Sequence, residues 1–91
     1  MIYLYVRQTV SDYAQWKEGF DIHFSTRQAG GATREALVLR DVEHPNEITT
    51  VLGWRDLAQA RLFTESVSWQ VGLERMGVVG VPEVRFLEAG G

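Results

Sequence analysis

Hydrophobic and polar residues alternate with a period of two in four short segments of the chain, and β-branched and aromatic residues are frequent there. Both features are typical of strands, because successive side chains of a strand point to opposite faces of the sheet. The alternation predicts strands over residues 2–9, 33–41, 47–54 and 83–88. Between the second and third strands, His44-Pro45-Asn46 has the composition of a turn.

The segment after the first strand has the hydrophobic spacing of a helix. Asp12 is a favourable N-cap residue, and Gln15 three positions later completes a capping-box pattern. Gly30 and Gly31 supply a stop signal. We therefore predict one helix that begins after Asp12 and runs to about Gln28.

The segment after the third strand repeats the capping pattern with Asp56 and Gln59. A single straight helix would place Trp69 opposite Ala60, so its hydrophobic residues would not share one face. Ser66 is suited to cap a new helix. The sequence therefore predicts two helices, over residues 57–65 and 67–76.

The predicted order of elements is strand, helix, strand, strand, helix, strand. This βαββαβ order is that of the ferredoxin-like fold, an α+β architecture in which a four-stranded antiparallel sheet carries its helices on one face. A chain of 91 residues without a linker or low-complexity tract is expected to form one domain. We therefore expect a single ferredoxin-like domain over residues 1–91.

Helices on one face of such a sheet leave the other face uncovered, and in a monomer that face should be polar. The strands instead carry apolar residues on both sides. The alternation places Ile2, Leu4 and Val6 opposite Tyr3 and Tyr5, Leu37 and Leu39 opposite Ala36 and Val38, and Val84 and Phe86 opposite Leu87. Scattered apolar surface residues are normal in monomers. Their recurrence on three strands nevertheless favours a homodimer formed by sheet-to-sheet packing.

The composition excludes several classes of protein. The net charge is −3 with no basic excess, which argues against a nucleic-acid-binding protein. The absence of cysteine excludes disulfides, thiol catalysis and cysteine-ligated zinc. No apolar run approaches the roughly 18 residues of a membrane-spanning helix, and residues 1–7 lack the features of a signal peptide. We expect a cytoplasmic protein with no membrane or nucleic-acid partner.

The first predicted helix carries the most informative candidates for chemistry. Its aromatic residues share one side: Tyr13, Trp16, Phe20 and Phe24. His23 and Arg27 lie in the middle of this stripe, where ionisable groups need a partner, water or a ligand. In a pocket between helix and sheet, His23 is the candidate general base or hydrogen-bond donor. Arg27 is the candidate group for holding an enolate, phenolate or carboxylate.

Five aromatic residues are candidates for the walls of this pocket and for substrate binding: Trp16, Phe20, Trp54, Phe63 and Trp69. Flat apolar walls with one or two polar anchors suit a planar aromatic or polyketide-like ligand. A structural alternative assigns these rings to the core and His23 to a single backbone hydrogen bond. Under this alternative Arg27 extends to solvent at the end of its helix.

The remaining polar residues point to structural roles. No metal site is expected, because two histidines and no cysteine offer no ligand spacing of the His-x-x-x-His type. Arg7 and Arg40 lie on strands and are expected to pair with carboxylates such as Asp41 or Glu47. Residues 77–80, Gly-Val-Val-Gly, lack the Lys-Ser/Thr ending of a phosphate loop and are expected to form a connecting loop.

Three segments and one single residue carry a family resemblance: residues 12–21 (DYAQWKEGFD), 54–63 (WRDLAQARLF) and 76–83 (MGVVGVPE), together with Ser66. With these segments, almost the whole chain resembles the dimeric α/β-barrel superfamily, in which two ferredoxin-like protomers pack sheet to sheet. Within that superfamily the chain is most similar to antibiotic biosynthesis monooxygenase-like proteins and small cyclase-like relatives. One position departs from the pattern. Trp54 and Asp56 match, but Phe63 stands where many haem-degrading and monooxygenase-like relatives have a histidine, which argues against haem ligation and weakens the case for oxygenation.

The resemblance implies a small enzyme that needs no cofactor and oxygenates, cyclises or isomerises an aromatic or polyketide-like metabolite. The aromatic stripe of the first helix makes His23 and Arg27 the candidate catalytic residues of such an enzyme. The absence of a strong catalytic signature and the phenylalanine at position 63 favour a different hypothesis, a non-catalytic homodimer that binds a small hydrophobic ligand or takes part in a stress response. A third hypothesis, a purely structural module, predicts a filled core without a cavity.

Overall fold

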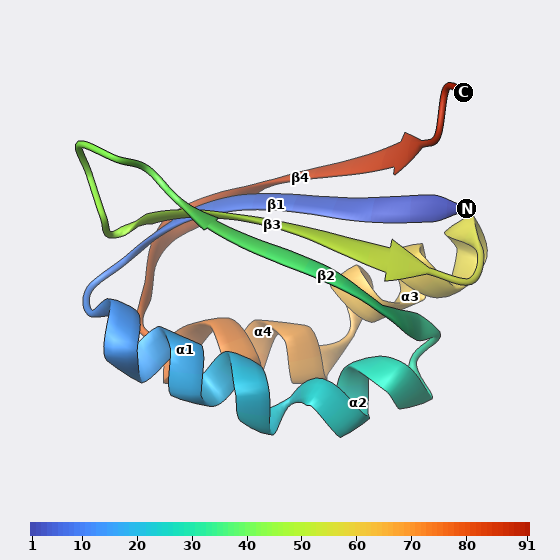
Figure 1. Cartoon of the computed structure of the whole chain (residues 1–91). Helices are drawn as coiled ribbons and strands as arrows, with labels where there is room; N and C mark the ends of the chain where they lie inside the picture. Colours follow the sequence, from blue (N-terminus) through green and yellow to red (C-terminus); the bar gives the residue numbers. More distant parts are fainter.

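The computed structural model describes residues 1–91 as four strands and four helices (Figure 1). The strands are β1 (Ile2–Val10), β2 (Ala32–Arg40), β3 (Glu47–Trp54) and β4 (Val78–Glu88). The helices are α1 (Tyr13–Ile22), α2 (Phe24–Ala29), α3 (Leu57–Glu65) and α4 (Val67–Arg75). The order is the predicted one, with each helical connection divided into two helices.

The strands form one antiparallel sheet in the order β2-β3-β1-β4. The central pair, β1 and β3, runs in register from Ile2 opposite Trp54 to Thr9 opposite Glu47. All four helices lie on one side of the sheet, which leaves the other side uncovered (Figure 1). This arrangement confirms the prediction of an α+β ferredoxin-like fold. None of the helices combines the length and the apolar character that a membrane crossing requires.

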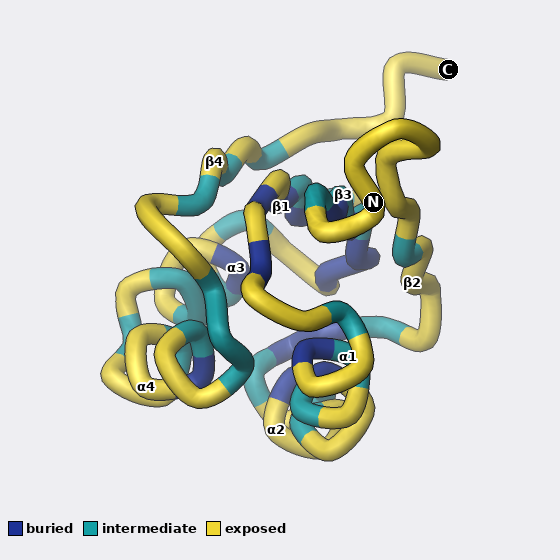
Figure 2. Tube along the Cα trace, turned by 90° about the vertical axis from the view of Figure 1, so that its left-hand side faces the viewer, coloured by how far each residue is buried: buried dark blue, intermediate teal, exposed yellow.

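The core lies between the sheet and the helices, where the buried residues in Figure 2 are concentrated. Its ten buried hydrophobic residues are Leu4, Val6, Val10, Trp16, Phe20, Ala32, Ile48, Leu52, Trp54 and Ala60. Alternate residues of β1 and β3 supply most of the sheet side of this core, as the period of two predicts. Gln8 and Thr50 are buried at inward positions of the same two strands. The sheet side of the core is therefore interrupted by two polar side chains.

The predicted helix caps are present at three positions. The carboxylates of Asp12 and Asp56 accept hydrogen bonds from the backbone N–H groups of Gln15 and Gln59, at 3.3 and 2.8 Å. Ser66 Oγ accepts from the N–H of Trp69 at 3.1 Å, so the predicted break between α3 and α4 is confirmed. These bonds satisfy N–H groups that the first turn of a helix leaves without a partner.

One of the two hydrogen bonds predicted for the first capping box is absent. The side chain of Gln15 does not return to Asp12. Its Nε2 donates instead to the carbonyl of Arg75 at 3.2 Å. This bond ties α1 to the last residue of α4, and a tertiary contact of this kind has no local sequence signal.

The prediction of one helix up to Gln28 is also wrong, because the helix is interrupted at His23. His23 Nδ1 bonds to the carbonyl of Gly19 at 2.7 Å, and Arg27 Nη1 donates to the carbonyl of Phe20 at 2.6 Å. Side chains that bond the carbonyls of the last helical turn end the helix there. The interruption leaves Phe24 42% exposed, so this ring does not continue the buried part of the predicted aromatic stripe.

Strand β4 begins at Val78, five residues before its predicted start, so only Gly77 lies in the connection and residues 78–80 are not the connecting loop that their composition indicates. The pairing with β1 shifts between Arg7, which lies opposite Glu83, and Thr9, which lies opposite Val79. Three residues, Gly80 among them at φ +75°, are thereby accommodated opposite a single residue of β1. Such a bulge lets a strand contain both a glycine and a proline, which otherwise argue against a strand.

The uncovered face of the sheet carries apolar side chains on all four strands. Register with β1 and β3 places Tyr3, Tyr5, Leu37, Leu39, Val51 and Leu87 on this face. Leu37 is 56% exposed and Leu39 is 49% exposed. The prediction of a sheet that is apolar on both sides is thus confirmed at these positions.

Candidate functional site

A cavity of about 50 Å³ lies between the sheet and the helices. Its sheet side is formed by Val6, Gln8, Thr50 and Leu52. Its other lining residues come from α1, from the α1–α2 junction and α2, and from α3 and α4, namely Trp16, Phe20, His23, Thr26, Arg27, Phe63, Ser68, Trp69, Gly72, Leu73 and Met76 at the end of α4. A purely structural module predicts a filled core, whereas the packing of this core leaves a small space between the sheet and the helices.

Two columns of aromatic rings contribute residues to the lining of this cavity. In the first, from α1, Trp16 stacks on Tyr13 at 6.1 Å and on Phe20 at 4.9 Å between ring centroids. Arginine guanidinium groups cover both ends of this column, Arg40 at 3.7 Å from the Tyr13 ring and Arg27 at 3.8 Å from the Phe20 ring. Cations over aromatic faces are attracted by the ring quadrupole, so the column is held at both ends.

The second column comes from β3, α3 and α4. Phe63 lies between Trp54, at 4.8 Å, and Trp69, at 5.5 Å between centroids. Phe63 and Trp69 line the cavity, whereas Trp54 does not. Trp54 is fully buried, and its Nε1–H donates to the carbonyl of Gly30 at 3.0 Å. The structure thus assigns Trp54 to the core and to the α2–β2 connection, not to the wall of the cavity.

His23 lines the cavity from the interruption between α1 and α2. Its Nδ1 lies 2.7 Å from the carbonyl oxygen of Gly19. Because a carbonyl only accepts hydrogen bonds, Nδ1 carries the proton and the neutral ring has its lone pair on Nε2. The backbone therefore fixes both the orientation of the ring and the tautomer that can take up a proton.

Arg27 is only 7% exposed and lines the same cavity. The expectation that it extends to solvent at the helix end is wrong, because its guanidinium is held inside by the Phe20 carbonyl and the Phe20 ring. Burial lowers the pKa of Arg27, and the charge of Asp21 partly offsets this effect. No carboxylate lies within ion-pair distance of it, so the cavity contains a buried cation without a bonded counter-ion.

Two residues at the cavity carry further polar groups that the sequence patterns do not identify as part of the site. Gln8 Oε1 and Trp16 Nε1 are buried and have no hydrogen-bond partner in the protein. Both residues line the cavity. A signal for Gln8 was present, because it occupies an inward position of β1 in the series Leu4, Val6, Gln8 and Val10. A polar side chain at an inward strand position needs a partner inside the fold.

Six of the seven predicted site residues thus surround one cavity: Trp16, Phe20, His23, Arg27, Phe63 and Trp69. The cavity itself is small. For comparison, an engineered cavity that binds benzene in a well-packed core has a volume of about 150 Å³. A groove of about 350 Å³ lies between α4 and β4, and Trp69 and Leu73 line both spaces. Movement of these two side chains would join the cavity to the groove.

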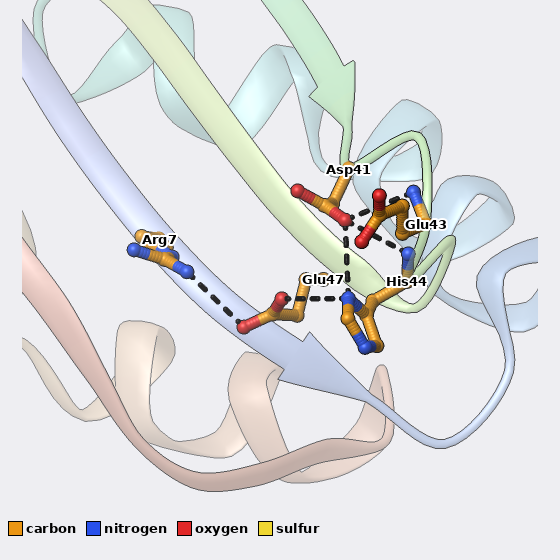
Figure 3. A network of polar contacts seen from close by, with 5 residues as sticks. All are labelled: Arg7, Asp41, Glu43, His44 and Glu47. Atoms are coloured by element: carbon orange, nitrogen blue, oxygen red, sulfur yellow. Dashed lines mark hydrogen bonds and ion pairs between the residues drawn. The ribbon is translucent and has the colours of Figure 1, made fainter.

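A second polar cluster lies at the β2–β3 turn (Figure 3), and none of its residues lines the cavity. Asp41 Oδ2 accepts from the N–H groups of Glu43 and His44 at 3.0 and 2.8 Å and lies 3.2 Å from His44 Nδ1. These bonds lower the pKa of Asp41. Glu47 lies 3.9 Å from His44 Nδ1 and pairs with Arg7 at 3.3 Å.

Potential metal-ligating atoms of Asp41, His44 and Glu47 lie within 4.8 Å of one another. The bonds that these side chains make within the turn account for their arrangement, and the cluster serves to hold the turn. The predicted pairing of Arg7 with Glu47 is confirmed. The predicted carboxylate partner of Arg40 is wrong, because Arg40 donates to the carbonyl of Pro45 at 2.9 Å and lies over Tyr13.

Comparison with known proteins finds similarity at the level of structure. No protein-family model and no curated protein matches the chain. A candidate antibiotic biosynthesis monooxygenase from Bordetella bronchiseptica superposes with a TM-score of 0.79 at 18% identity, over 97% of this chain and 95% of that one. SnoaB, a cofactor-independent oxygenase from Streptomyces nogalater, superposes with a TM-score of 0.77 at 16% identity, over 99% and 93%.

A candidate antibiotic biosynthesis monooxygenase from Nitrosomonas europaea superposes over the whole of both chains, with a TM-score of 0.71 at 11% identity. These likenesses extend over nearly the full length of every chain compared. The chain therefore has the ferredoxin-like fold of these antibiotic biosynthesis monooxygenase-like structures, as the sequence resemblance implies.

Proposed function

We propose that this protein is a small enzyme that needs no cofactor and acts on an aromatic or polyketide-like metabolite. The observation that carries the proposal is the buried guanidinium of Arg27 beside an apolar cavity that His23 also lines. A base and a cation in an apolar cavity are the groups that removal of an acidic proton from carbon or from a phenol requires. The neighbours in structure, among them a cofactor-independent oxygenase, support the same class of chemistry.

In this proposal His23 is the general base. Its Nδ1–H is engaged by the Gly19 carbonyl, so Nε2 is the nitrogen that accepts the proton. The resulting imidazolium keeps its bond to the same carbonyl and needs no change of orientation. A positioned base of this kind contributes about 10²- to 10⁴-fold to a rate.

Arg27 stabilises the enolate or phenolate that remains. Only one of its five N–H donors has a protein partner, the Phe20 carbonyl. The other donors are thus available to an oxyanion in the cavity. Charge stabilisation by a fixed donor is strongest where water is excluded, and Arg27 is held in such a place.

Oxygenation, cyclisation and isomerisation share this deprotonation as their first step. For oxygenation of a CH₂ group between aromatic rings, molecular oxygen is the oxidant. The carbanion reacts with O₂ to give a peroxide, which loses water and leaves a carbonyl group. One oxygen atom enters the product and the other leaves as water, with the proton held by His23 returned to the departing hydroxide. Only this branch consumes oxygen, so oxygen uptake distinguishes it from the other two.

Ligand entry requires the cavity to enlarge. Helix α4 is the element proposed to move, because it carries Trp69 and Leu73, the two residues that line both the cavity and the groove. Its two ends are also suited to movement: Ser66 has an extended backbone, and Gly77 adopts φ +76°. Displacement of α4 with Trp69 and Leu73 would open the cavity to the groove against β4.

We also propose that two copies of the chain pack through the uncovered face of the sheet. That face combines apolar side chains, among them the exposed Leu37 and Leu39 of the edge strand β2, and charges of both signs. Arg7, Arg85, Glu47 and Glu83 lie on it, and a two-fold axis would allow opposite charges of two copies to meet. Such a dimer would cover one of the two faces of each sheet, while the cavity lies under the other.

A non-catalytic binding protein is the second candidate function. Phe63, which stands at the position of a histidine in many relatives of this type, favours it: this ring packs between Trp54 and Trp69 and offers no ligand or proton-transfer group. On this hypothesis the same cavity binds a hydrophobic ligand without turnover.

Oxygen uptake with 1,8-dihydroxyanthrone as the probe, measured above the spontaneous rate, separates the two functions. The enzyme hypothesis in its oxygenase form predicts consumption of one O₂ for each quinone formed, without added cofactor. Saturable binding of this probe with no product detectable by mass spectrometry would favour the binding protein. Neither binding nor product across anthrones, naphthols and related phenols would contradict both functions.

A further inference from the structure

Gln8 and Trp16 are two neutral polar residues at the cavity that the proposed chemistry does not use. Gln8, on β1, is 7% exposed, and Trp16, on α1, is completely buried. The amide oxygen of Gln8 and the indole N–H of Trp16 both lack a hydrogen-bond partner. They come from opposite sides of the same cavity, one from the sheet and one from the helix layer.

The two unpartnered groups are complementary in chemistry. An indole N–H only donates, and an amide oxygen only accepts. Most buried polar groups in folded proteins are paired, and leaving one unpaired destabilises the fold. Gln8 also interrupts an inward row of apolar residues, where leucine or valine would pack without this penalty. Two such penalties beside one cavity point to a group that both residues bind.

We infer that Gln8 and Trp16 together recognise a hydroxyl group of the ligand, which donates to Gln8 Oε1 and accepts from Trp16 Nε1–H. A hydroxyl is the smallest group that offers a donor and an acceptor from one atom. The inference rests on the proposed function of this cavity and narrows the ligand to a phenol, an enol or an alcohol. Gln8 and Trp16 position the ligand, while the proton transfer belongs to His23.

The test compares three probes of similar size on the full chain: phenol, toluene and anisole. Phenol presents both donor and acceptor, anisole only an acceptor, and toluene neither. Binding is followed by the indole N–H signals of the three tryptophans in two-dimensional NMR. The Trp16 signal is expected to move downfield with phenol as its N–H gains a partner. The Trp54 signal is an internal reference, because its N–H is already bonded to Gly30.

Gln8→Leu removes the amide while keeping a similar volume. The preference for phenol over toluene, taken as the ratio of their dissociation constants, is expected to fall about three- to tenfold in Gln8→Leu, the value of one hydrogen bond. The melting temperature without probe is expected to rise by about 4 °C, because an unpaired buried acceptor is removed. Trp16→Phe should lower the phenol preference by a similar factor.

Gln59→Leu is the matched control. Gln59 Oε1 is also buried and unpartnered, but Gln59 does not line the cavity. Its replacement should raise the melting temperature in the same way and leave the phenol preference unchanged. A comparable loss of preference in Gln59→Leu would show that the effect does not come from the cavity.

Several results would overturn the inference. One is an unchanged phenol preference in Gln8→Leu, and another is binding of anisole as tight as that of phenol. A melting temperature lowered by Gln8→Leu would mean that Gln8 and Trp16 satisfy each other in the free protein. Phenol preference without turnover of any substrate would contradict the enzyme hypothesis alone. Equal binding of all three probes would contradict the hydroxyl subsite alone, and no binding would contradict both.

Discussion

The guanidinium of Arg27 lies 3.8 Å from the centroid of the Phe20 ring, and its Nη1 donates to the carbonyl oxygen of Phe20 at 2.6 Å. Phe20 of α1 thus holds the guanidinium of Arg27, which belongs to α2, through both its ring and its backbone carbonyl. The contact spans the interruption at His23, and it keeps the cation beside the cavity instead of in solvent. The charge and the base of the proposed site are therefore positioned by the same irregularity of the helix.

Arg27→Met tests the role of this charge. Methionine keeps much of the apolar volume but cannot stabilise an oxyanion, so kcat/KM with 1,8-dihydroxyanthrone should fall about 10²- to 10³-fold. The free energy of unfolding in urea should change by less than about 1 kcal/mol, because loss of the bond to Phe20 is offset by removal of a desolvated charge. Arg61→Met is the control, since Arg61 is exposed and lies over Phe86 at 5.8 Å. Equal losses in both variants would contradict a specific role for Arg27.

His23→Ala should preserve the fold and lower turnover of the same probe by at least about 100-fold, because the proton acceptor is lost. Circular dichroism checks the fold, and steady-state kinetics the turnover. His44→Ala is the matched control. His44 is the only other histidine, and it lies in the exposed turn cluster. Unchanged activity of His23→Ala would remove His23 from the mechanism.

Most of the fold follows from signals that are local in the sequence. Asp12, Asp56 and Ser66 cap helices because each side chain reaches an N–H group three residues ahead, and such contacts need no knowledge of the rest of the chain. The interruption at His23 depends on Arg27 being held inside, and the early start of β4 depends on its pairing with β1. Both depend on the assembled fold, so local patterns could not supply them.

Most residues of the candidate site, like most of the fold, could be predicted from local patterns in the sequence. The aromatic stripe of the first helix identified Trp16, Phe20, His23 and Arg27, which do surround one cavity. Trp54 was assigned to the wall because of its residue type, although its indole N–H is bonded to Gly30 in the core. The orphaned state of a buried polar atom depends on every neighbour in three dimensions. The alternation of β1 indicates the inward position of Gln8, but the missing partner of its amide oxygen became visible only in the assembled structure.

Leu37→Lys combined with Leu39→Lys tests the proposed sheet-to-sheet dimer. Both leucines are exposed in the single chain, so two lysines should not disturb its fold, but they would place charges among the apolar residues of the proposed interface. Light scattering coupled to size exclusion should report a dimer for the wild type and half that mass for the variant. Ile22→Lys is the control, because Ile22 is 70% exposed on the helix side. A monomeric wild type at micromolar concentration would contradict the dimer.

Asp41→Asn is predicted to make the free energy of unfolding less dependent on pH under acidic conditions. Bonds from the His44 N–H and its side chain lower the pKa of Asp41 from its usual 3.8, so the folded state binds this proton less readily than the unfolded chain. The stabilisation is present above about pH 3.8 and is lost as the pH falls through the lowered pKa. Asparagine still accepts the turn bonds but does not titrate. Urea denaturation should therefore show that the free energy of unfolding falls less between pH 5 and 2 in Asp41→Asn than in the wild type. An equal fall of this free energy in both proteins would contradict the role of Asp41.

Gly72 is predicted to be a position where stability and ligand binding oppose each other. It is buried in the interior of α4, yet a Cβ added there would meet no atom within 4 Å, and its backbone φ is not positive. Alanine should therefore stabilise the helix by about 0.5–1 kcal/mol, which a thermal melt would report as an increase of a few degrees.

The same methyl group would enter the cavity that Gly72 lines, whose volume is only about 50 Å³. Binding of phenol and turnover of 1,8-dihydroxyanthrone should both weaken in Gly72→Ala, and more so in Gly72→Leu. Gly77→Ala is the contrasting control at the end of the same helix. It should destabilise the fold, because Gly77 has φ +76° and an added Cβ would lie 2.7 Å from Ser11 Oγ. A stabilised Gly72→Ala protein that binds and turns over its probes like the wild type would mean that the cavity is a packing defect and that the ligand binds elsewhere.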